Sequence, residues 1–260
     1  MISIDPELIK QMADNGKRLD NRAADQYREI KIEKNVVTSA EGSARVRIGN
    51  TEVVAGVKMD VGTPFSDTPN EGVLMVGAEF VPLASPEFES GPPGEAAVEL
   101  ARVVDRAIRE SKIMDMEKLC IKEGEKVWMV YVDIDILDDD GNLIDASSLA
   151  AIAALSSVKI PKLNDDTKVV YGEKGTSALP LKGHALSTTF VKIGNSIFAD
   201  PSLPEFEALD ARLTVGTFNQ DGKTMLSSMQ KGGTEGFTLQ EIEKIMDMAV
   251  KKGDELRALL

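Results

Sequence analysis

Residues 44–57 read Ala-Arg-Val-Arg-Ile-Gly-Asn-Thr-Glu-Val-Val-Ala-Gly-Val and contain the pattern that decides the fold. Apolar residues recur at every second position before and after Gly49-Asn50, which is typical of two strands that each bury one face. A Gly-Asn pair between two such runs favours a tight hairpin turn. The stretch therefore predicts a β-hairpin that packs one face on a core.

The same pattern continues on both sides of this hairpin. Residues 30–32 and 73–81 also have strand character, so we expect an antiparallel meander of about four strands. An apolar face with a 3.6-residue period predicts a helix that ends near Ser111. Residues 127–137 form a strongly apolar strand pattern, and we expect Asp145 to cap a helix that continues to Ser157.

The second half of the sequence repeats the order of strands followed by a helix. Its expected strands are at residues 186–193, 196–199, 211–218 and 224–229. The sequence Thr238-Leu239-Gln240-Glu241 is a capping box and predicts the start of the last helix.

This order predicts an α+β fold in which helices cover one face of each sheet. We expect an N-terminal domain at residues 1–160, including a helix at residues 5–14 that Asp5 caps. A linker and a first strand follow at residues 161–185, with the linker beginning near Lys159, and the C-terminal domain occupies residues 186–260.

Composition excludes several classes of protein. The formal net charge of −13 disfavours a large nucleic-acid-binding surface, so any contact with nucleic acid needs a local basic patch. The single cysteine, Cys120, cannot form an internal disulfide and is expected to be buried, and the single histidine, His184, is expected to have a structural role or to be exposed. No apolar stretch approaches the length of a membrane span, and we expect a cytoplasmic protein.

Three arginines form the most informative local feature. Arg102, Arg106 and Arg109 fall within about 60° of one another on the predicted helix and could grip successive phosphates. Acidic residues on or near the same face, among them Glu99 and Asp105, permit a second interpretation as a surface of ion pairs.

Several motifs together resemble the RNase PH family. They occur in the family's order over nearly the whole chain, at residues 18–22, 42–44, 49–51, the arginine helix and residues 140–142. Residues 67–72, 89–95, 100–106 and 141–146 are similar to the ring subunits of archaeal exosomes that are regarded as non-catalytic. The resemblance implies an RNase PH-like fold of two α/β subdomains, each with a mixed or antiparallel sheet covered by helices.

The resemblance also implies a chemistry, in which inorganic phosphate attacks the terminal 3′ linkage of RNA. Active members place Ser or Thr followed by Arg after an Asp-Gly-type turn, whereas this chain has Asn142-Leu143. They also carry two aspartates about six residues apart. Asp200 matches the first, and Phe206 stands at the second position between Glu205 and Glu207. We expect Asp200 to cap the end of a strand before Pro201, although a slipped loop could bring one glutamate into register.

The resemblance therefore implies a subunit without catalytic residues, metal ligands or cofactor of its own. It implies a hexameric ring of three heterodimers with a catalytic RNase PH-like homologue, together with RNA-binding cap subunits. Phosphate and Mg²⁺ would act at the partner's site, and Arg102, Arg106 and Arg109 would bind single-stranded RNA. An active phosphate-dependent exoribonuclease that uses Asp200 with Glu205 or Glu207, and a purely structural ring scaffold, are the alternatives.

Overall fold

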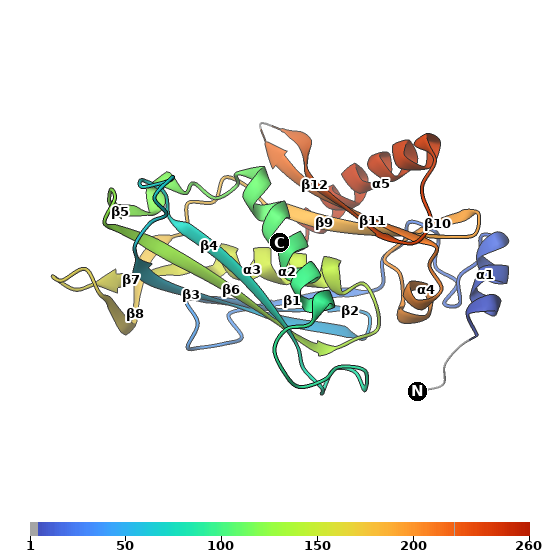
Figure 1. Cartoon of the computed structure of the whole chain (residues 1–260), viewed down its shortest axis with the longest axis horizontal. Coiled ribbons are helices and arrows are strands. Elements are labelled where there is room, and N and C mark those ends of the chain that lie inside the picture. The colour runs from blue at the N-terminus through green and yellow to red at the C-terminus, as the bar shows by residue number, and fades with distance from the viewer. Residues whose placement is uncertain (1–4, 221) are drawn as a thin grey trace.

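Two large sheets with helices packed between them form most of the structure, a computed structural model that describes residues 5–220 and 222–260 (Figure 1). The larger sheet has six strands: β1 (Ile30–Lys34), β2 (Gly42–Ile48), β3 (Thr51–Gly62), β4 (Val73–Phe80), β5 (Cys120–Lys122) and β6 (Lys126–Asp138). Their order is β1-β2-β3-β6-β4, with β5 paired to β6. Only β4 runs parallel to its neighbour β6, so the sheet is mixed.

The predicted hairpin is confirmed as β2 and β3. Ile48 pairs with Thr51, so the turn has two residues, and Gly49 has a φ of 60°, which favours glycine. Side chains of β3 alternate between buried and half-buried over its first eight residues, as expected for a strand with one face on the core.

Helix α3 (Leu143–Ser157) lies between the sheets and forms the centre of the core. It contacts β2 and β3 on one side and β9 on the other, and its residues 144–155 are all buried. The small alanine and serine side chains of α3 permit close packing on β2. The two elements are so close that a Cβ on Gly42 would lie 2.5 Å from the Ala154 carbonyl oxygen. Helix α2 (Glu95–Ser111) packs beside it on β4.

The smaller sheet is antiparallel, with the order β10-β9-β11-β12. Its strands are β9 (Ala185–Ile193), β10 (Ser196–Ala199), β11 (Ala211–Gln220) and β12 (Lys223–Gly233), and they confirm the four strands expected there. We expected helices on one face of each sheet, but α5 (Leu239–Arg257) also packs on β9 and β11, opposite α2 and α3. Both faces are covered, which explains why the first eight residues of β11 are all buried.

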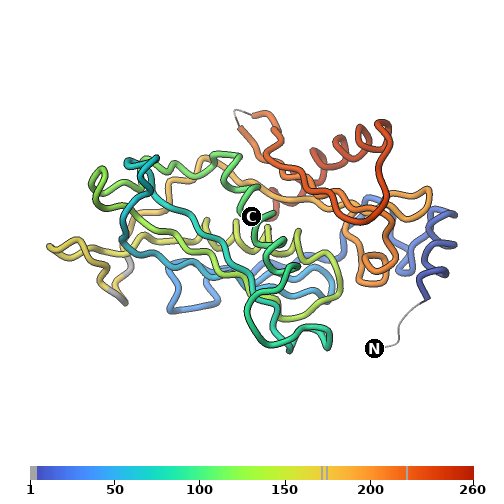
Figure 2. Tube along the Cα trace, in the orientation of Figure 1, coloured from blue at the N-terminus to red at the C-terminus, as the bar shows by residue number. Residues whose placement is uncertain are grey.

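The N-terminal helix α1 (Pro6–Asp14) begins as predicted, with Asp5 accepting a hydrogen bond from the Glu7 amide at 3.0 Å. We assigned it to the N-terminal domain, but it packs against the second sheet. Ile9 and Ala13 share a small core with residues of β9 and β10, and Figure 2 shows this helix beside these strands.

Three further expectations differ from the structure. The segment expected to be a linker forms a hairpin of β7 (Lys159–Leu163) and β8 (Val169–Ala178). The short helices η1 (Glu117–Leu119) and α4 (Leu203–Glu207) were not expected from the sequence. Cys120 is half-buried instead of buried, because the short strand β5 lies at the margin of the sheet.

No helix in the described part of the chain is both long and apolar enough to span a membrane.

Candidate functional site

The arginine helix α2 is amphipathic, as its sequence predicts. Its apolar side chains, among them Leu100, Val104 and Ile108, are buried in the main core, whereas the three arginines are exposed. The helix ends at Ser111, because the next residue, Lys112, adopts the left-handed conformation. The packing on β4 and β12 fixes the orientation of the arginine face.

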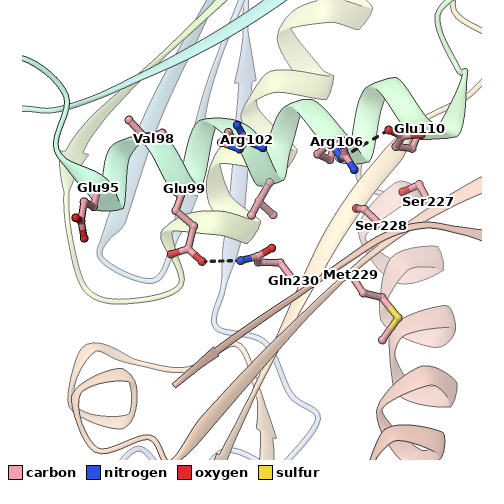
Figure 3. A pocket seen from close by; sticks show the side chains of 11 residues that line it. Glu95, Val98, Glu99, Arg102, Arg106, Glu110, Ser227, Ser228, Met229 and Gln230 are labelled. Carbon is pink, nitrogen blue, oxygen red and sulfur yellow. Dashed lines mark hydrogen bonds and ion pairs between the residues drawn. The ribbon is translucent and has the colours of Figure 1, made fainter. Parts of the chain in front are cut away.

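A cavity of about 660 Å³ lies between α2 and β12, and Arg102 and Arg106 both line it (Figure 3). The opposite wall comes from residues 227–230 of β12, which contribute two serines, a methionine and a glutamine. Arg106 is only weakly engaged, at 3.6 Å from the exposed carboxylate of Glu110. Arg102 has neither an ion pair nor a hydrogen bond to any side chain that the structure describes.

Arg109 does not belong to this cavity. Its guanidinium donates to the Asp105 carboxylate at 2.6 and 3.0 Å and to the Leu74 carbonyl at 3.0 Å. The hydrogen bond to Asp105 raises the pKa of Arg109 above its ordinary value. The structure therefore brings Arg102 and Arg106 together at the cavity and holds Arg109 in an ion pair with Asp105. The ion-pair interpretation concerned all three arginines, and it fits Arg109 best.

Glu99, on the same helix, turns toward the second half of the chain. Its carboxylate binds the Arg212 guanidinium and accepts a hydrogen bond from the Gln230 amide at 3.2 Å. These two contacts hold the charge of Glu99 on β11 and β12, so it does not pair with either arginine of the cavity.

The turn before α3 is the position at which active relatives carry a hydroxyl and a guanidinium. Gly141 has a φ of 86°, and a Cβ there would lie 2.5 Å from the Leu203 amide nitrogen, so glycine is required. Asn142 follows with a φ of 56° and is buried. Its side-chain amide donates to Asp145 at 2.9 Å and to Asp200 at 2.8 Å, and Leu143 lines the adjacent cavity. The turn therefore presents no cation.

Asp200 is fully buried and is held by arginines from the N-terminal segment. Arg28 donates to both carboxylate oxygens at 2.9 and 2.8 Å, and Arg22 donates to one of them at 2.8 Å. Burial raises the pKa of Asp200, but the hydrogen bonds and charge of Arg28 outweigh this effect and lower it. Asp200 directly follows β10 and has a φ of 47°. The contacts of its carboxylate anchor the segment before β1.

Glu205 and Glu207 have different surroundings. Glu205 forms a buried two-pronged ion pair with Arg18, at 2.8 and 2.5 Å, and also accepts a hydrogen bond from the Ser202 amide as part of a capping box. Glu207 is exposed and borders the cavity beside Leu143. Neither glutamate lies free beside Asp200.

Asp145 is not the N-cap that the sequence suggested. Helix α3 begins two residues earlier, and the Asp145 carboxylate accepts hydrogen bonds from the Tyr27 hydroxyl at 2.6 Å and from Thr189 at 2.7 and 3.0 Å. Burial raises the pKa of Asp145 to about 6 in spite of these bonds. The group joins three parts of the chain: the segment before β1, α3 and β9.

Sequence reasoning gave no role to Arg18, Arg22 or Arg28. The first two lie in the motif at residues 18–22 that supported the family resemblance, and this was the available signal. Their buried partners come from more than 170 residues away, a relation that no local pattern contains. Across the described residues no three His, Cys, Asp or Glu side chains are arranged to hold a metal ion.

Comparisons with known proteins find matches over most of the chain. Residues 26–161 match the 3′ exoribonuclease family, domain 1, and residues 185–252 match domain 2 of the same family. The chain is 47% identical over 249 residues to the exosome complex component Rrp42 of Methanothermobacter thermautotrophicus, covering 95% of this chain and 91% of that protein.

Two solved structures have the same fold. A chain of the Archaeoglobus fulgidus exosome with RNA bound to the active site has a TM-score of 0.90 at 45% identity, covering 97% of this chain and 96% of that one. A chain of an archaeal exosome core has a TM-score of 0.84 at 41% identity, covering 97% and 94%. The expected two-domain fold with mixed and antiparallel sheets is thereby confirmed.

Proposed function

The chain belongs to the RNase PH family of 3′ exoribonucleases, and we propose that it is a non-catalytic ring subunit of an exosome that degrades RNA from its 3′ end with phosphate. In this role it supports the active site of a catalytic homologue and contacts the RNA backbone through Arg102 and Arg106. The similar proteins named as exosome components, and the similar chain from an exosome with bound RNA, support this assignment.

One observation carries the proposal: the groups that this chemistry requires are missing or already bound. Phosphate needs charge-assisted donors, but Asn142 is directed toward two carboxylates and Leu143 has no donor. A carboxylate that manages a proton or a metal must be available, but Asp200 and Glu205 are each buried against arginines. Removing one partner from such a buried pair costs about 3–5 kcal/mol, so the carboxylates stay bound.

The RNA contact rests on the cavity between α2 and β12. Arg102 and Arg106 are exposed there. Three carboxylates also line the cavity: Glu99 is engaged by Arg212, Glu110 approaches Arg106 only to 3.6 Å, and Glu95 forms no ion pair with either arginine in the part of the chain that the structure describes. Two exposed guanidinium groups one helical turn apart suit successive phosphates of a strand, and such contacts are independent of base sequence. The net charge of −13 then confines RNA to this local site.

The arrangement of three heterodimers with a catalytic homologue, the cap subunits and the cytoplasmic location stay predictions. The purely structural alternative fits Arg109, which is fully engaged within the helix, but it gives no role to Arg102.

The test is a phosphorolysis assay with single-stranded RNA, phosphate and magnesium. The purified chain alone should release no nucleoside diphosphate. Mixed with the catalytic-type homologue of the same genome, it should form a large complex with more activity than the homologue has by itself, as measured by product release and light scattering. Robust release by the chain alone would overturn the proposal and establish the active-enzyme alternative. A complex without any gain in activity would leave only the scaffold role.

A further inference from the structure

Arg212, on β11, occupies a fitted slot in the smaller sheet. Its side chain is only 8% exposed, and its guanidinium lies over the Phe206 ring at 5.8 Å from the ring centre, a distance that permits a cation–π contact. Gly232 pairs with Arg212 across β11 and β12, and a Cβ on Gly232 would lie 2.9–3.0 Å from three atoms of the guanidinium. The glycine therefore leaves the room that the guanidinium fills, and the position of the charge is fixed.

The slot directs this charge at Glu99 of α2. One carboxylate oxygen of Glu99, Oε1, accepts a hydrogen bond from Arg212 Nη2 and another from Gln230 Nε2, the latter at 3.2 Å. Gln230 belongs to β12, so both donors come from the smaller sheet. Figure 3 shows Glu99 reaching from its helix toward Gln230. The carboxylate is thus drawn away from the arginines of its own helix.

Without Arg212, Glu99 would have another cation within reach. Arg102 follows Glu99 by three positions on α2, which is a spacing at which opposite charges pair on the surface of a helix. The other two carboxylates of the cavity are placed differently. Glu95 lies seven positions before Arg102, and Glu110 approaches Arg106 instead. Glu99 is therefore the carboxylate that is best placed to neutralise Arg102.

We propose that Arg212 is a positioning residue for RNA binding: it holds Glu99 against the smaller sheet and thereby keeps Arg102 available to phosphate. This inference rests on the proposed function and adds a residue that does not line the cavity itself. A released Glu99 carboxylate would act twice, because it would occupy the Arg102 guanidinium and would also repel the phosphates of the strand. The contact of α2 with the smaller sheet then sets the affinity of the ring for RNA.

The experiment is a double-mutant cycle at positions 99 and 212, measured by filter binding of single-stranded RNA to the assembled ring. Arg212→Met releases Glu99 and should cost one phosphate contact, which is about fivefold in affinity at about 0.1 M salt and about 0.7 in the salt slope. Glu99→Gln should bind RNA at least as tightly as the wild type.

The double variant Glu99→Gln/Arg212→Met decides between an electrostatic and a merely structural role. We expect it to regain the affinity and the salt slope of the wild type, because the charge that would occupy Arg102 is gone. If the double variant bound RNA as weakly as Arg212→Met does, the loss would come from disturbed packing, and the proposal would be overturned. Should Arg212→Met fail to assemble into the ring, Arg212→Gln removes the same charge, and its rescue by Glu99→Gln decides in the same way.

The matched control is Arg257→Met on α5. Arg257 is 9% exposed and pairs with Asp254, so this change also removes a shielded arginine from an ion pair, and RNA affinity should stay unchanged. An equal loss in Arg257→Met would contradict a specific role of Arg212. Thermal melting verifies the folding of each variant, and light scattering verifies the ring.

Charge reversal of Arg102 and Arg106 separates this inference from the proposed function. RNA binding that survives the reversal would contradict the proposed RNA contact itself. Binding that is lost in the reversal but unchanged in Arg212→Met would contradict only the role of Arg212.

Discussion

At the scale of single residues, buried carboxylates connect the two halves of the chain. Asp145 and Asp200 are both buried, and Asn142 donates to both of them, yet their pKa values shift in opposite directions. Asp200 is surrounded by guanidinium groups and stays ionised, whereas Asp145 receives only neutral donors and binds a proton more readily. The nature of the donors, more than the depth of burial, separates the two groups.

The raised pKa of Asp145 predicts a pH dependence of stability. The folded value of about 6 exceeds the unfolded value of about 3.9, so the folded state holds the proton more tightly. The contribution of Asp145 is then fully present below about pH 4 and is lost as the pH rises to about 6, a fall on the order of 3 kcal/mol. Asn mimics the protonated carboxyl, so Asp145→Asn should remove this fall. Urea unfolding from pH 4 to pH 7 measures it.

The matched control is Asp247→Asn on the exposed face of α5. Its free energy of unfolding should run parallel to that of the wild type at every pH. The difference between Asp145→Asn and the wild type should instead grow as the pH rises. Parallel curves for all three proteins would show that Asp145 titrates normally in the folded chain.

At the scale of elements, the arginines of α2 have two different roles. Arg102 and Arg106 line the cavity, whereas Arg109 forms an ion pair with Asp105. The charge reversals Arg102→Glu and Arg106→Glu, made together in the assembled ring, should weaken RNA binding at least tenfold at low salt. The dependence of log affinity on log salt should become shallower by about 0.7 for each phosphate that the ring no longer binds. Filter binding of single-stranded RNA over a range of salt concentrations measures both quantities.

Arg109→Glu is the control on the same helix. It breaks the ion pair with Asp105 and should lower the free energy of unfolding by about 0.5 kcal/mol, with RNA affinity unchanged. If Arg109→Glu weakened RNA binding as much as the double reversal, all three arginines would bind RNA together, as the family resemblance implied.

The sequence alone predicted the helices and strands that depend on local sequence patterns. Alternation predicted β2 and β3, a 3.6-residue period predicted α2, and a capping box predicted the start of α5. The start of α3 was missed because the left-handed conformation of Asn142 depends on contacts of Gly141 with the segment before α4. Asp145 resembled a cap by type, but its partner Thr189 lies 44 residues away. For the same reason, the arginines that bind Asp200 could not be found from any local pattern.

At the scale of the whole molecule, buried contacts interlock the two domains. The segment before β1 supplies Arg18, Arg22 and Arg28 to carboxylates that follow β10. Helix α1 packs on the second sheet, and α2 packs on β12. Unfolding either half alone would leave buried charges without partners, at several kcal/mol for each ion.

This interlock predicts a single cooperative unfolding transition. Trp128 is the only tryptophan, lies in β6 of the larger sheet and is buried, so its fluorescence follows the first half. Hydrogen exchange of the α5 amides follows the second half. Both probes should give the same midpoint in urea. Independent domains would instead give two midpoints, since nothing in the first half would depend on α5.

A substitution within the interlock makes this prediction sharper. Arg18→Met leaves buried Glu205 with only the longer contact to Arg22, at 4.0 Å, and should lower the free energy of unfolding by about 3–5 kcal/mol at both probes equally. The control is Arg47→Met. The Arg47 side chain is 53% exposed and pairs with Glu52, so its loss should lower the free energy of unfolding by no more than about 1 kcal/mol. If Arg18→Met lowered the free energy of unfolding only at the α5 amides, the second half would open by itself. The ion pair of Arg18 with Glu205 would then stabilise only that half.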